Sequence, residues 1–319
     1  MNAESRAKPL VLVTGSSGLI GVGIIETLSP NYRVIGLDIK RPEDAVRGED
    51  WIECDLTDDD SVMKTLSRIR GEYGHHIASV IHLAAYYDFS GEPSPLYQTL
   101  TVEGTKRLLK RLQEFQVEQF IFSSTLLVMK PAEEDELLTE ASETQAEWDY
   151  PRSKLQAEQV IRQERGTIPA VILRIAGVYD EACHSVPIAQ QISRIYEKKL
   201  ESYFFPGDKT HGQAFIHLAD LVECFRTTVE CRRKLRPQEM LLIAEADVMS
   251  YVELQEHLGE LIHGQEWPTI RIPKVVAKAG AWAQEKVVGK EDAFIKPWMV
   301  DLADQHYPVA INRARELLN

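Results

Sequence analysis

Residues 10–21 read LVLVTGSSGLIG, so an apolar run leads directly into a glycine-rich turn. The apolar run predicts a buried strand, and the periodicity of the residues that follow, from Gly18 to Leu28, predicts a helix. In between, Gly15 allows a tight turn, Gly18 lets a phosphate approach the backbone, and Gly21 permits close packing of helix on strand. The N–H groups and dipole at the helix start favour an anionic diphosphate, so we expect a dinucleotide site here.

A carboxylate follows the second predicted strand, Arg33–Leu37, at Asp38. A carboxylate in this place accepts hydrogen bonds from the adenosine ribose hydroxyls and repels a 2′-phosphate, so Asp38 favours NAD over NADP. Lys40 and Arg41 come shortly afterwards, and we interpret them as part of a solvated loop. Asp55, after the third strand, would lie near the adenine amino group or cap a helix.

Small residues end the fourth predicted strand at Leu83-Ala84-Ala85, as is needed where a backbone passes beside a cofactor. We expect the bound cofactor to be NAD. The residues predicted to bind it are Gly15, Ser17, Gly18, Leu19, Ile20, Asp38, Asp55, Leu56, Leu83, Ala84, Ala85, Ser123, Tyr150 and Lys154.

Short apolar runs alternate with amphipathic stretches up to about Gly177. This alternation predicts an α/β fold with a Rossmann-type, doubly wound parallel sheet that carries helices on both faces. Beyond that point the rhythm changes, which indicates a smaller C-terminal substrate lobe. We therefore expect an NAD-binding domain at 1–176, to which 214–244 return, and a substrate lobe formed by 177–213 and 245–319.

Composition narrows the class of protein. The chain has 319 residues, 44% of them hydrophobic, which is enough to bury a sizeable core. Its 36 basic and 49 acidic side chains give a formal net charge of −13, which disfavours nucleic-acid binding as the main activity. The four cysteines form no C-x-x-C pair, and no histidine cluster has metal-ligand spacing, so we expect free thiols in a reducing compartment and no metal.

The segment Met1–Lys8 is polar and lacks the apolar region of a signal peptide. No apolar run approaches the roughly 20 residues of a membrane span. We therefore expect a cytoplasmic protein that does not insert in a membrane. Residues 310–319 end within a helical pattern without a stop signal, which indicates either a fraying end or a chain that continues.

Tyr150 and Lys154 stand four residues apart, just where Pro151 marks the start of a helix, so both lie on one helix face. A phenol has a reference pKa of about 10 and needs a nearby ammonium to act as an acid–base near neutral pH. Ser124 and Thr125 end the fifth predicted strand, at the carboxyl edge where α/β sites form, and a hydroxyl there can hold a substrate oxygen.

These features together resemble the extended short-chain dehydrogenase/reductase family, which includes the NAD-dependent nucleotide-sugar epimerases and dehydratases. The resemblance extends over nearly the whole chain. It rests on residues 14–21, Asp38, residues 83–85, Ser123-Ser124-Thr125, Tyr150-x-x-x-Lys154, residues 174–179, which are similar to the family's L-R-x-x-x-V-Y, and residues 215–222, which are similar to F-x-H-V-x-D-V.

The resemblance implies hydride transfer to NAD at a hydroxyl-bearing carbon. In that mechanism Tyr150 removes the hydroxyl proton, Lys154 lowers the tyrosine pKa and binds the nicotinamide ribose, and Thr125 hydrogen-bonds the reacting oxygen. Ser124 remains an alternative to Thr125 as the catalytic hydroxyl. The family also commonly forms homodimers through the helices that correspond to Leu96–Phe115 and Arg152–Arg165.

Several positions depart from the family pattern. Leu126-Leu127 replace the Asp-Glu pair with which 4,6-dehydratases eliminate water, which argues against dehydratase activity. Thr101 stands where the family often has asparagine, Val128-Met129-Lys130 replaces V-Y-G, and Gly207-Asp208-Lys209 replaces G-D-G. These differences weaken the case for a standard sugar-nucleotide epimerase.

The leading hypothesis is an NAD-dependent oxidoreductase or epimerase that acts on a nucleotide sugar or a related hydroxyl compound. Its predicted substrate-binding residues are Tyr87, Arg174, Lys209 and His211, although Arg174 could equally form an ion pair at a strand end. We expect His217 to organise a strand–helix junction rather than to catalyse.

Two alternatives remain at the level of sequence. A secondary-alcohol or hydroxysteroid-type dehydrogenase, or a ketone reductase, would line its pocket with residues such as Trp267, Trp282 and Trp298, and the second lobe offers few clustered arginines for a diphosphate. A regulator that binds NAD without chemistry is the other alternative, and Tyr150 and Lys154 argue against it.

Overall fold

The computed structural model describes residues 8–41, 50–88, 91–133, 135–288 and 297–318. The segment 1–7, to which most of the expectation about a signal peptide applies, lies outside the described residues. The centre of the molecule is a seven-stranded sheet in which every pair of neighbouring strands is parallel. In spatial order its strands are β12 (Gln238–Ile243), β8 (Ala170–Ile175), β7 (Phe120–Thr125), β5 (Ser79–His82), β1 (Leu10–Thr14), β2 (Arg33–Asp38) and β3 (Asp50–Glu53).

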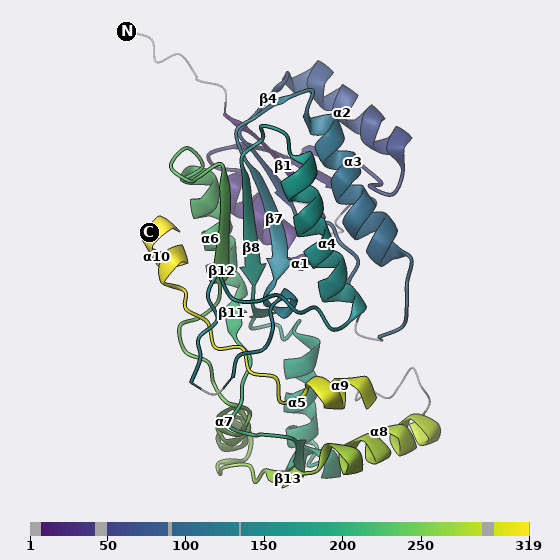
Figure 1. The fold of residues 1–319 in the computed structure, drawn as a ribbon, viewed down its shortest axis with the longest axis vertical. Coiled ribbons are helices and arrows are strands. Elements are labelled where there is room, and N and C mark those ends of the chain that lie inside the picture. Colours follow the sequence, from purple (N-terminus) through teal and green to yellow (C-terminus); the bar gives the residue numbers. More distant parts are fainter. Residues whose placement is uncertain (1–7, 42–49, 89–90, 134, 289–296, 319) are drawn as a thin grey trace.

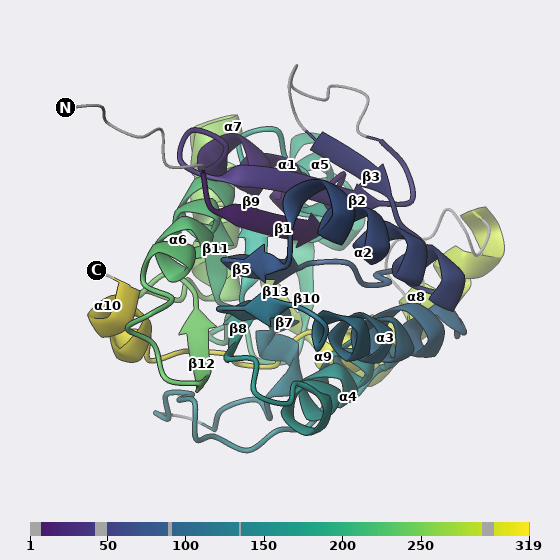
Figure 2. The same ribbon diagram turned by 90° about the horizontal axis from the view of Figure 1, so that it is seen from above.

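Helices cover both faces of this sheet (Figures 1 and 2). On one face α1 (Leu19–Leu28) packs against α6 (Leu218–Glu230). On the other face α2 (Asp59–Tyr73), α3 (Glu103–Leu112) and α4 (Asp149–Glu164) lie side by side. This is the doubly wound α/β fold that the alternation of apolar runs predicted.

The order of the strands reverses between β1 and β5. The chain moves outward from β1 through β2 to β3, then returns to the other side of β1 for β5 and β7. In open parallel sheets the crevice for a ligand forms outside the carboxyl ends of the strands at this reversal. The glycine turn follows β1, and Leu83 follows β5, so the two segments meet at this point of the sheet.

Burial explains why apolar residues begin the central strands β7 and β8. All six residues of β7 and all six of β8 are buried, because helices cover both faces of a parallel sheet. Two apolar clusters result, one on each face. The first includes Ile24 of α1 and Phe225 of α6, and the second includes Leu66 of α2 and Leu108 of α3.

A smaller lobe lies beyond the carboxyl edge of the sheet, in the lower part of Figure 1. It contains α5 (Val186–Tyr196), α7 (Tyr251–His263), α8 (Lys274–Val288) and α9 (Pro297–Leu302), together with the short parallel pair β10 (Phe204–Pro206) and β13 (Ile270–Ile272). A second short pair, β9 (Gly177–Tyr179) with β11 (Phe215–His217), lies where the chain passes between lobe and sheet. A third pair is β4 (His76–Ile77) with β6 (Gln116–Val117).

The last part of the chain differs from the predicted division into domains. The helix α10 (Asn312–Leu318) packs on β12 and α6 rather than on the lobe. Tyr307, Val309 and Ile311 are buried in the same cluster as α1 and α6, together with Ala314. Four apolar residues in this short segment need a core, and the sheet supplies it. Residues 307–318 therefore belong with the sheet, which corrects the assignment of all of 245–319 to the lobe.

The long predicted helix at Leu96–Phe115 is divided in two. Residues Tyr97–Val102 form a π-helical turn, η1, which runs directly into α3. Two short 3₁₀ turns, η2 (Leu126–Val128) and η3 (Leu200–Tyr203), complete the helical elements of the described chain. None of the helices in these described residues is both long enough and apolar enough to cross a membrane.

A substitution at Gly21 tests how closely α1 packs on the glycine turn. A Cβ at this position would lie 2.5 Å from the Gly15 carbonyl oxygen and 2.8 Å from Ser16 Cα, which are backbone atoms that cannot rotate away. We expect Gly21→Ala to lower the free energy of unfolding by about 1–3 kcal/mol, as measured by urea denaturation.

Gly71 in α2 is the matched control, because a Cβ there would meet nothing within 4 Å. Gly71→Ala should raise the free energy of unfolding by up to about 1 kcal/mol, since alanine is the better helix former. Equal effects of the two substitutions would contradict the packing role of Gly21.

Candidate active site

The glycine turn has the geometry that its sequence predicted. Gly15 adopts a φ of 69°, and a Cβ there would lie 2.7 Å from the backbone nitrogen of Ala84. Gly18 is the N-cap of α1, and its missing Cβ would have the Gly15 carbonyl oxygen, at 3.4 Å, as its one neighbour within 4 Å among the described residues. The first helical hydrogen bond runs from the Val22 N–H to Gly18. The N–H groups of Leu19 and Ile20 precede it and lack an intrahelical acceptor.

Asp38 lies directly beside this turn. Its Oδ2 accepts a hydrogen bond of 3.0 Å from the Ser17 N–H, and its Oδ1 accepts one of 2.7 Å from the Ile39 N–H. The Ser17 hydroxyl donates to the carbonyl of Lys40, which fixes the start of the following loop. A carboxylate has about four acceptor positions, so Asp38 retains capacity for a ribose diol.

Asp55 is used partly for local structure. Its Oδ1 accepts hydrogen bonds from the N–H and the hydroxyl of Thr57, at 2.8 and 2.7 Å. The cap of α2 is Asp58, whose side chain accepts from the Asp60 and Ser61 N–H groups. Of the two roles considered for Asp55, the helix cap is therefore wrong, and a contact with the adenine stays a prediction. Leu56 is buried, and α3 passes close to it at Gly104. A Cβ at Gly104 would lie 3.2 Å from the Leu56 Cβ and from the Leu56 carbonyl oxygen.

A buried histidine connects the glycine turn with α3. The His82 Nδ1 lies 2.7 Å from the Thr14 hydroxyl, and its Nε2 lies 2.8 Å from the Thr105 hydroxyl. The Thr105 hydroxyl has one proton, which it donates to the Thr101 carbonyl at 2.6 Å, so it must accept from a protonated His82 Nε2. His82 Nδ1 is then the acceptor of the Thr14 proton.

This chain of hydrogen bonds also holds the loop after β5. The Ala84 N–H donates to the Thr14 hydroxyl at 3.3 Å, and the Tyr86 N–H donates to the Thr101 hydroxyl at 3.0 Å. Burial, with the Lys154 charge adding to it, lowers the pKa of His82 from 6.5 to about 3, so the imidazole is neutral. Thr101, which departs from the family's asparagine, thus supports the backbone beside the predicted cofactor.

The end of β7 is attached to α4 through the predicted catalytic residues. The Lys154 ammonium donates a hydrogen bond of 2.7 Å to the Ser123 carbonyl and is 4.9 Å from the centroid of the Phe122 ring. The Thr125 hydroxyl lies near enough to the Tyr150 phenol to favour its charged form. Thr125, Tyr150 and Lys154 therefore lie together, and Lys154 is buried.

The electrostatics of this group differ from the expectation. Burial raises the pKa of Tyr150 above its ordinary value, and the Thr125 hydroxyl only partly offsets this. Burial also lowers the pKa of Lys154 from 10.5 to about 7, against the opposing effect of Glu158. The expectation that Lys154 lowers the phenol pKa is not met in this structure, because burial dominates both groups and the ammonium lies 5.9 Å from the centre of the phenol ring.

Two predicted site residues are committed to a buried ion pair instead. The Ser124 hydroxyl donates a hydrogen bond of 2.6 Å to the Glu158 carboxylate. This leaves Thr125 as the hydroxyl next to Tyr150. Arg174 is 2% exposed, and its guanidinium donates to both carboxylate oxygens of Glu158, at 3.1 and 2.8 Å. The structure therefore corrects two predictions. Arg174 forms the ion pair that was the alternative to its role as a substrate ligand, and Ser124 is a hydrogen-bond partner of that pair rather than the catalytic hydroxyl.

Aromatic side chains surround Tyr150. The Tyr87 ring meets it edge-on at 4.6 Å between centroids, so this predicted substrate residue does lie beside the candidate acid–base. Trp148 also contacts Tyr150, with ring centroids 5.5 Å apart. Trp148 was missed because nothing in its spacing separates it from an ordinary core tryptophan, and only its place two residues before Tyr150 could have indicated it.

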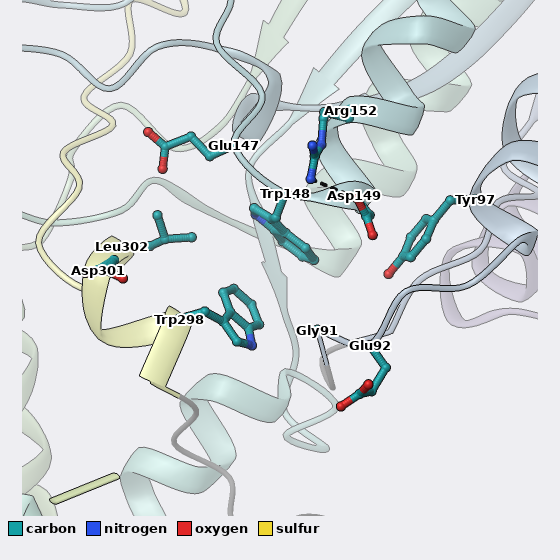
Figure 3. A pocket seen from close by; sticks show the side chains of 10 residues that line it. All are labelled: Gly91, Glu92, Tyr97, Glu147, Trp148, Asp149, Arg152, Trp298, Asp301 and Leu302. Atoms are coloured by element: carbon teal, nitrogen blue, oxygen red, sulfur yellow. Dashed lines mark hydrogen bonds and ion pairs between the residues drawn. The ribbon is translucent and has the colours of Figure 1, made fainter. Parts of the chain in front are cut away.

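A pocket of about 370 Å³ opens next to Trp148 (Figure 3). Trp148 and Trp298 of α9 lie against each other in its lining, with ring centroids 5.3 Å apart. Its polar lining is mostly acidic, and its one guanidinium, Arg152, pairs with Asp149 at 2.8 Å. The complete lining is Gly91, Glu92, Tyr97, Glu147, Trp148, Asp149, Arg152, Trp298, Asp301 and Leu302.

The other substrate-lobe candidates serve the lobe itself. The Lys209 ammonium approaches the Thr269 carbonyl at 3.5 Å, and His211 is 2.6 Å from the Asp304 carbonyl. Trp267 is buried and donates to the Ser202 carbonyl, while Trp282 is 55% exposed. Neither Lys209 nor His211 has a hydrogen bond, ion pair or ring contact with Tyr150 within the described ranges, so their substrate role stays a prediction.

His217 has the structural role that was expected of it. It is the N-cap of α6, where its side chain accepts a hydrogen bond of 3.2 Å from the Ala219 N–H. Its other ring nitrogen lies 3.2 Å from Glu181. Across the described ranges, no group of three or more His, Cys, Asp or Glu side chains could hold a metal ion.

The residues present fit a dinucleotide. The open position beside Gly18 and the N–H groups at the start of α1 follow β1, and the partly used carboxylate of Asp38 ends the adjoining strand β2. An anionic diphosphate is stabilised at such a helix start, and a ribose diol by such a carboxylate.

Comparison with known proteins identifies the class. The family model described as NAD dependent epimerase/dehydratase family matches residues 11–244, and the chain belongs to this family. The match includes the whole central sheet except the first residue of β1, and it ends just after β12. The family resemblance inferred from the motifs is thereby confirmed.

Particular proteins share this similarity. The chain is 26% identical to the decarboxylating sterol-4-alpha-carboxylate 3-dehydrogenase of Candida albicans over 53% of its own length, and spans about half the length of that curated relative. Among solved structures it resembles UDP-glucuronic acid 4-epimerase of Bacillus cereus, at 21% identity and a TM-score of 0.71 over 97% of this chain and 92% of that one. It resembles dTDP-glucose 4,6-dehydratase of Bacillus anthracis at 16% identity and a TM-score of 0.71, over 97% and 90%.

The neutral His82 makes stability depend on pH. The folded protein binds fewer protons than the unfolded chain between pH 3 and 6.5, so this contribution is complete above about pH 6.5 and is lost as the pH falls towards 3. We expect unfolding free energy to fall by up to about 1.4 kcal/mol per pH unit from this group within that window.

Urea denaturation of the wild type and of His82→Asn between pH 7 and 4.5 gives the free energy of unfolding of each protein as a function of pH. The difference between the two curves isolates the contribution of His82, because all other titrating groups are common to both. The variant should be less stable at pH 7 but should lose stability less steeply with acid. Parallel pH dependences would show that folding does not lower the pKa of His82.

Proposed function

We propose that this protein is an NAD-dependent oxidoreductase that uses Tyr150 as the acid–base at a hydroxyl-bearing carbon of its substrate. One observation carries the proposal. The Thr125 hydroxyl lies near enough to Tyr150 at the carboxyl edge of the sheet to influence its pKa, and the buried ammonium of Lys154 lies one helical turn further along α4. That arrangement has no evident structural purpose, because burial disfavours the charged forms of both Tyr150 and Lys154.

The roles of the residues follow from their chemistry. In its deprotonated form Tyr150 takes the hydroxyl proton of the substrate, and Thr125 donates a hydrogen bond to the reacting oxygen. Lys154 provides the positive charge that a phenolate needs, because its pKa of about 7 leaves a large fraction protonated at neutral pH. NAD, when bound, accepts the hydride from the carbon.

NAD would be held by the glycine turn and by Asp38. The diphosphate would meet the N–H groups of Leu19 and Ile20, and the adenosine ribose would meet the Asp38 carboxylate. A 2′-phosphate placed there would face the carboxylate, which supports NAD over NADP.

A nucleotide sugar or a related hydroxyl compound is the leading substrate. The structures of similar fold include UDP-glucuronic acid 4-epimerase in complex with UDP-glucuronic acid and NAD. For such a substrate the reaction is epimerisation, in which a carbon is oxidised and the hydride then returns to its other face. Leu126 and Leu127 cannot act as the acid and base of a dehydratase.

A sterol-type or other apolar secondary alcohol is the second candidate, and the pocket beside Trp148 favours it. The two indoles and Leu302 offer apolar surface, while Glu92, Glu147 and Asp301 would repel a diphosphate. The similarity to a sterol-4-alpha-carboxylate 3-dehydrogenase supports the same alternative.

We also propose a cytoplasmic homodimer. The family pairs subunits through the helices that correspond to α3 and α4, and these two helices lie side by side here. The paired surfaces would lie on the sheet domain, away from α5 and α7.

Removing the phenol hydroxyl tests the mechanism. We expect Tyr150→Phe to lower kcat for NAD reduction by about 10²- to 10⁴-fold, because general acid–base catalysis contributes a factor of that size. Tyr73→Phe is the control, since Tyr73 packs under Arg33 at the opposite edge of the sheet, where the guanidinium is 4.5 Å from its ring centre. Full activity of Tyr150→Phe would exclude the proposed acid–base.

A substrate panel separates the two candidates. UDP-sugars and sterol-like secondary alcohols are offered with NAD, and NADH formation or a change in the sugar configuration is followed. A nucleotide-sugar enzyme should leave the alcohols unchanged, and Trp298→Ala should reduce turnover strongly only for an apolar alcohol. If the wild-type protein converts neither UDP-sugars nor sterol-like alcohols, the result contradicts the proposed activity.

A further inference from the structure

Glu158 is a buried carboxylate that the proposed reaction does not use directly. It is fully buried on α4, one turn beyond Lys154 and two turns beyond Tyr150. Its Oε1 accepts hydrogen bonds from the Ser124 hydroxyl at 2.6 Å and from Arg174 at 3.1 Å. Its Oε2 accepts from Arg174 at 2.8 Å and from the more exposed Arg162 at 3.4 Å.

This network occupies the same strand end as the candidate catalytic residues. Ser124 and Arg174 are register partners on β7 and β8. Three successive residues of β7 each meet a different turn of α4: Thr125 meets Tyr150, the Ser123 carbonyl meets Lys154, and Ser124 meets Glu158. A change at Glu158 would therefore alter the surroundings of Lys154 without touching Tyr150.

We propose that Glu158 is a positioning residue for the candidate reaction: shared between Ser124 and Arg174, its carboxylate holds α4 against β7 and keeps the neighbouring Lys154 ammonium charged. The proposal rests on the proposed function for its catalytic meaning, but the charge of Lys154 can be measured independently.

The charges around Lys154 explain why it needs this carboxylate. The titratable groups that surround it are Tyr150 and Glu158 on its own helix, His82 on β5 and, through Glu158, Arg174 on β8. His82 is neutral and the phenol is protonated, so neither offsets a buried ammonium. Glu158 is the group whose charge favours protonation of Lys154, and it also compensates Arg174.

The substitution Glu158→Gln removes this charge and leaves Arg174 uncompensated. We expect the pKa of Lys154 to fall by about one unit or more from its value of about 7. A neighbouring opposite charge favours the charged form of a group and shifts its pKa by about 1–3 units. The titration is read from the ¹³Cε signals of labelled lysines in the free protein, with the Lys154 signal assigned by its loss in Lys154→Met.

Three further variants make the result specific. Glu158→Asp keeps the charge and should retain most of the wild-type titration. Glu164→Gln, at the end of α4 where Glu164 pairs with the exposed Lys106, should leave Lys154 unchanged. The double substitution Glu158→Gln with Arg174→Met leaves no uncompensated guanidinium, so we expect it to fold where the single variant fails, and it should still lower the Lys154 pKa, though by less.

The pH profile of kcat/KM links the network to the reaction. In Glu158→Gln, the loss of activity that follows deprotonation of Lys154 should move to lower pH by the same amount as the NMR titration. A purely structural role would lower the folded fraction but leave the profile in place.

The outcomes separate the two proposals. An unchanged Lys154 titration in both Glu158 variants that lack the charge would overturn the role of Glu158, whatever the enzyme turns over. Full activity of Tyr150→Phe would overturn the proposed function, while the lysine titration would still report on Glu158.

Discussion

The attachment of one strand end to one helix organises the chemistry of this protein. Ser123, Ser124 and Thr125 follow one another on β7, and they meet three different turns of α4, at Lys154, Glu158 and Tyr150 respectively. The Lys154 and Glu158 contacts are hydrogen bonds, the first to a main-chain carbonyl and the second from a side-chain hydroxyl. Because every residue of β7 is buried, little freedom remains for the helix to slide.

The cofactor half of the site was predictable because it depends on backbone. A glycine turn between a strand and a helix has few possible geometries, and Gly15 and Gly21 show the close approaches that their sequence pattern implies. The position of Asp38 beside the glycine turn was likewise predictable, because it stands at the end of the neighbouring strand. The fold class followed from the alternation of apolar runs, since burial on both faces requires it.

The remaining features depend on contacts between distant segments, which one sequence does not display. Arg174 follows an apolar run and looks available for a ligand, yet its partner Glu158 comes from a helix 16 residues earlier. Trp148 and Trp298 meet across 150 residues of chain, and Thr101 is connected to Thr14 through Thr105 and His82. The raised pKa of Tyr150 arises from burial, which the i, i+4 spacing with Lys154 does not reveal.

The position of α10 has a consequence for how the molecule behaves towards its own copies. It packs on β12, the outermost strand of the sheet on that side, and Arg313 holds it there through an ion pair with the buried Glu239 (Figure 1). A sheet margin left bare is a template for pairing with another chain, and proteins commonly shield it with a helix or charge. We therefore expect α10 to shield β12 from pairing with another chain, and a cut just before Asn312 to favour association of the molecule with its own copies.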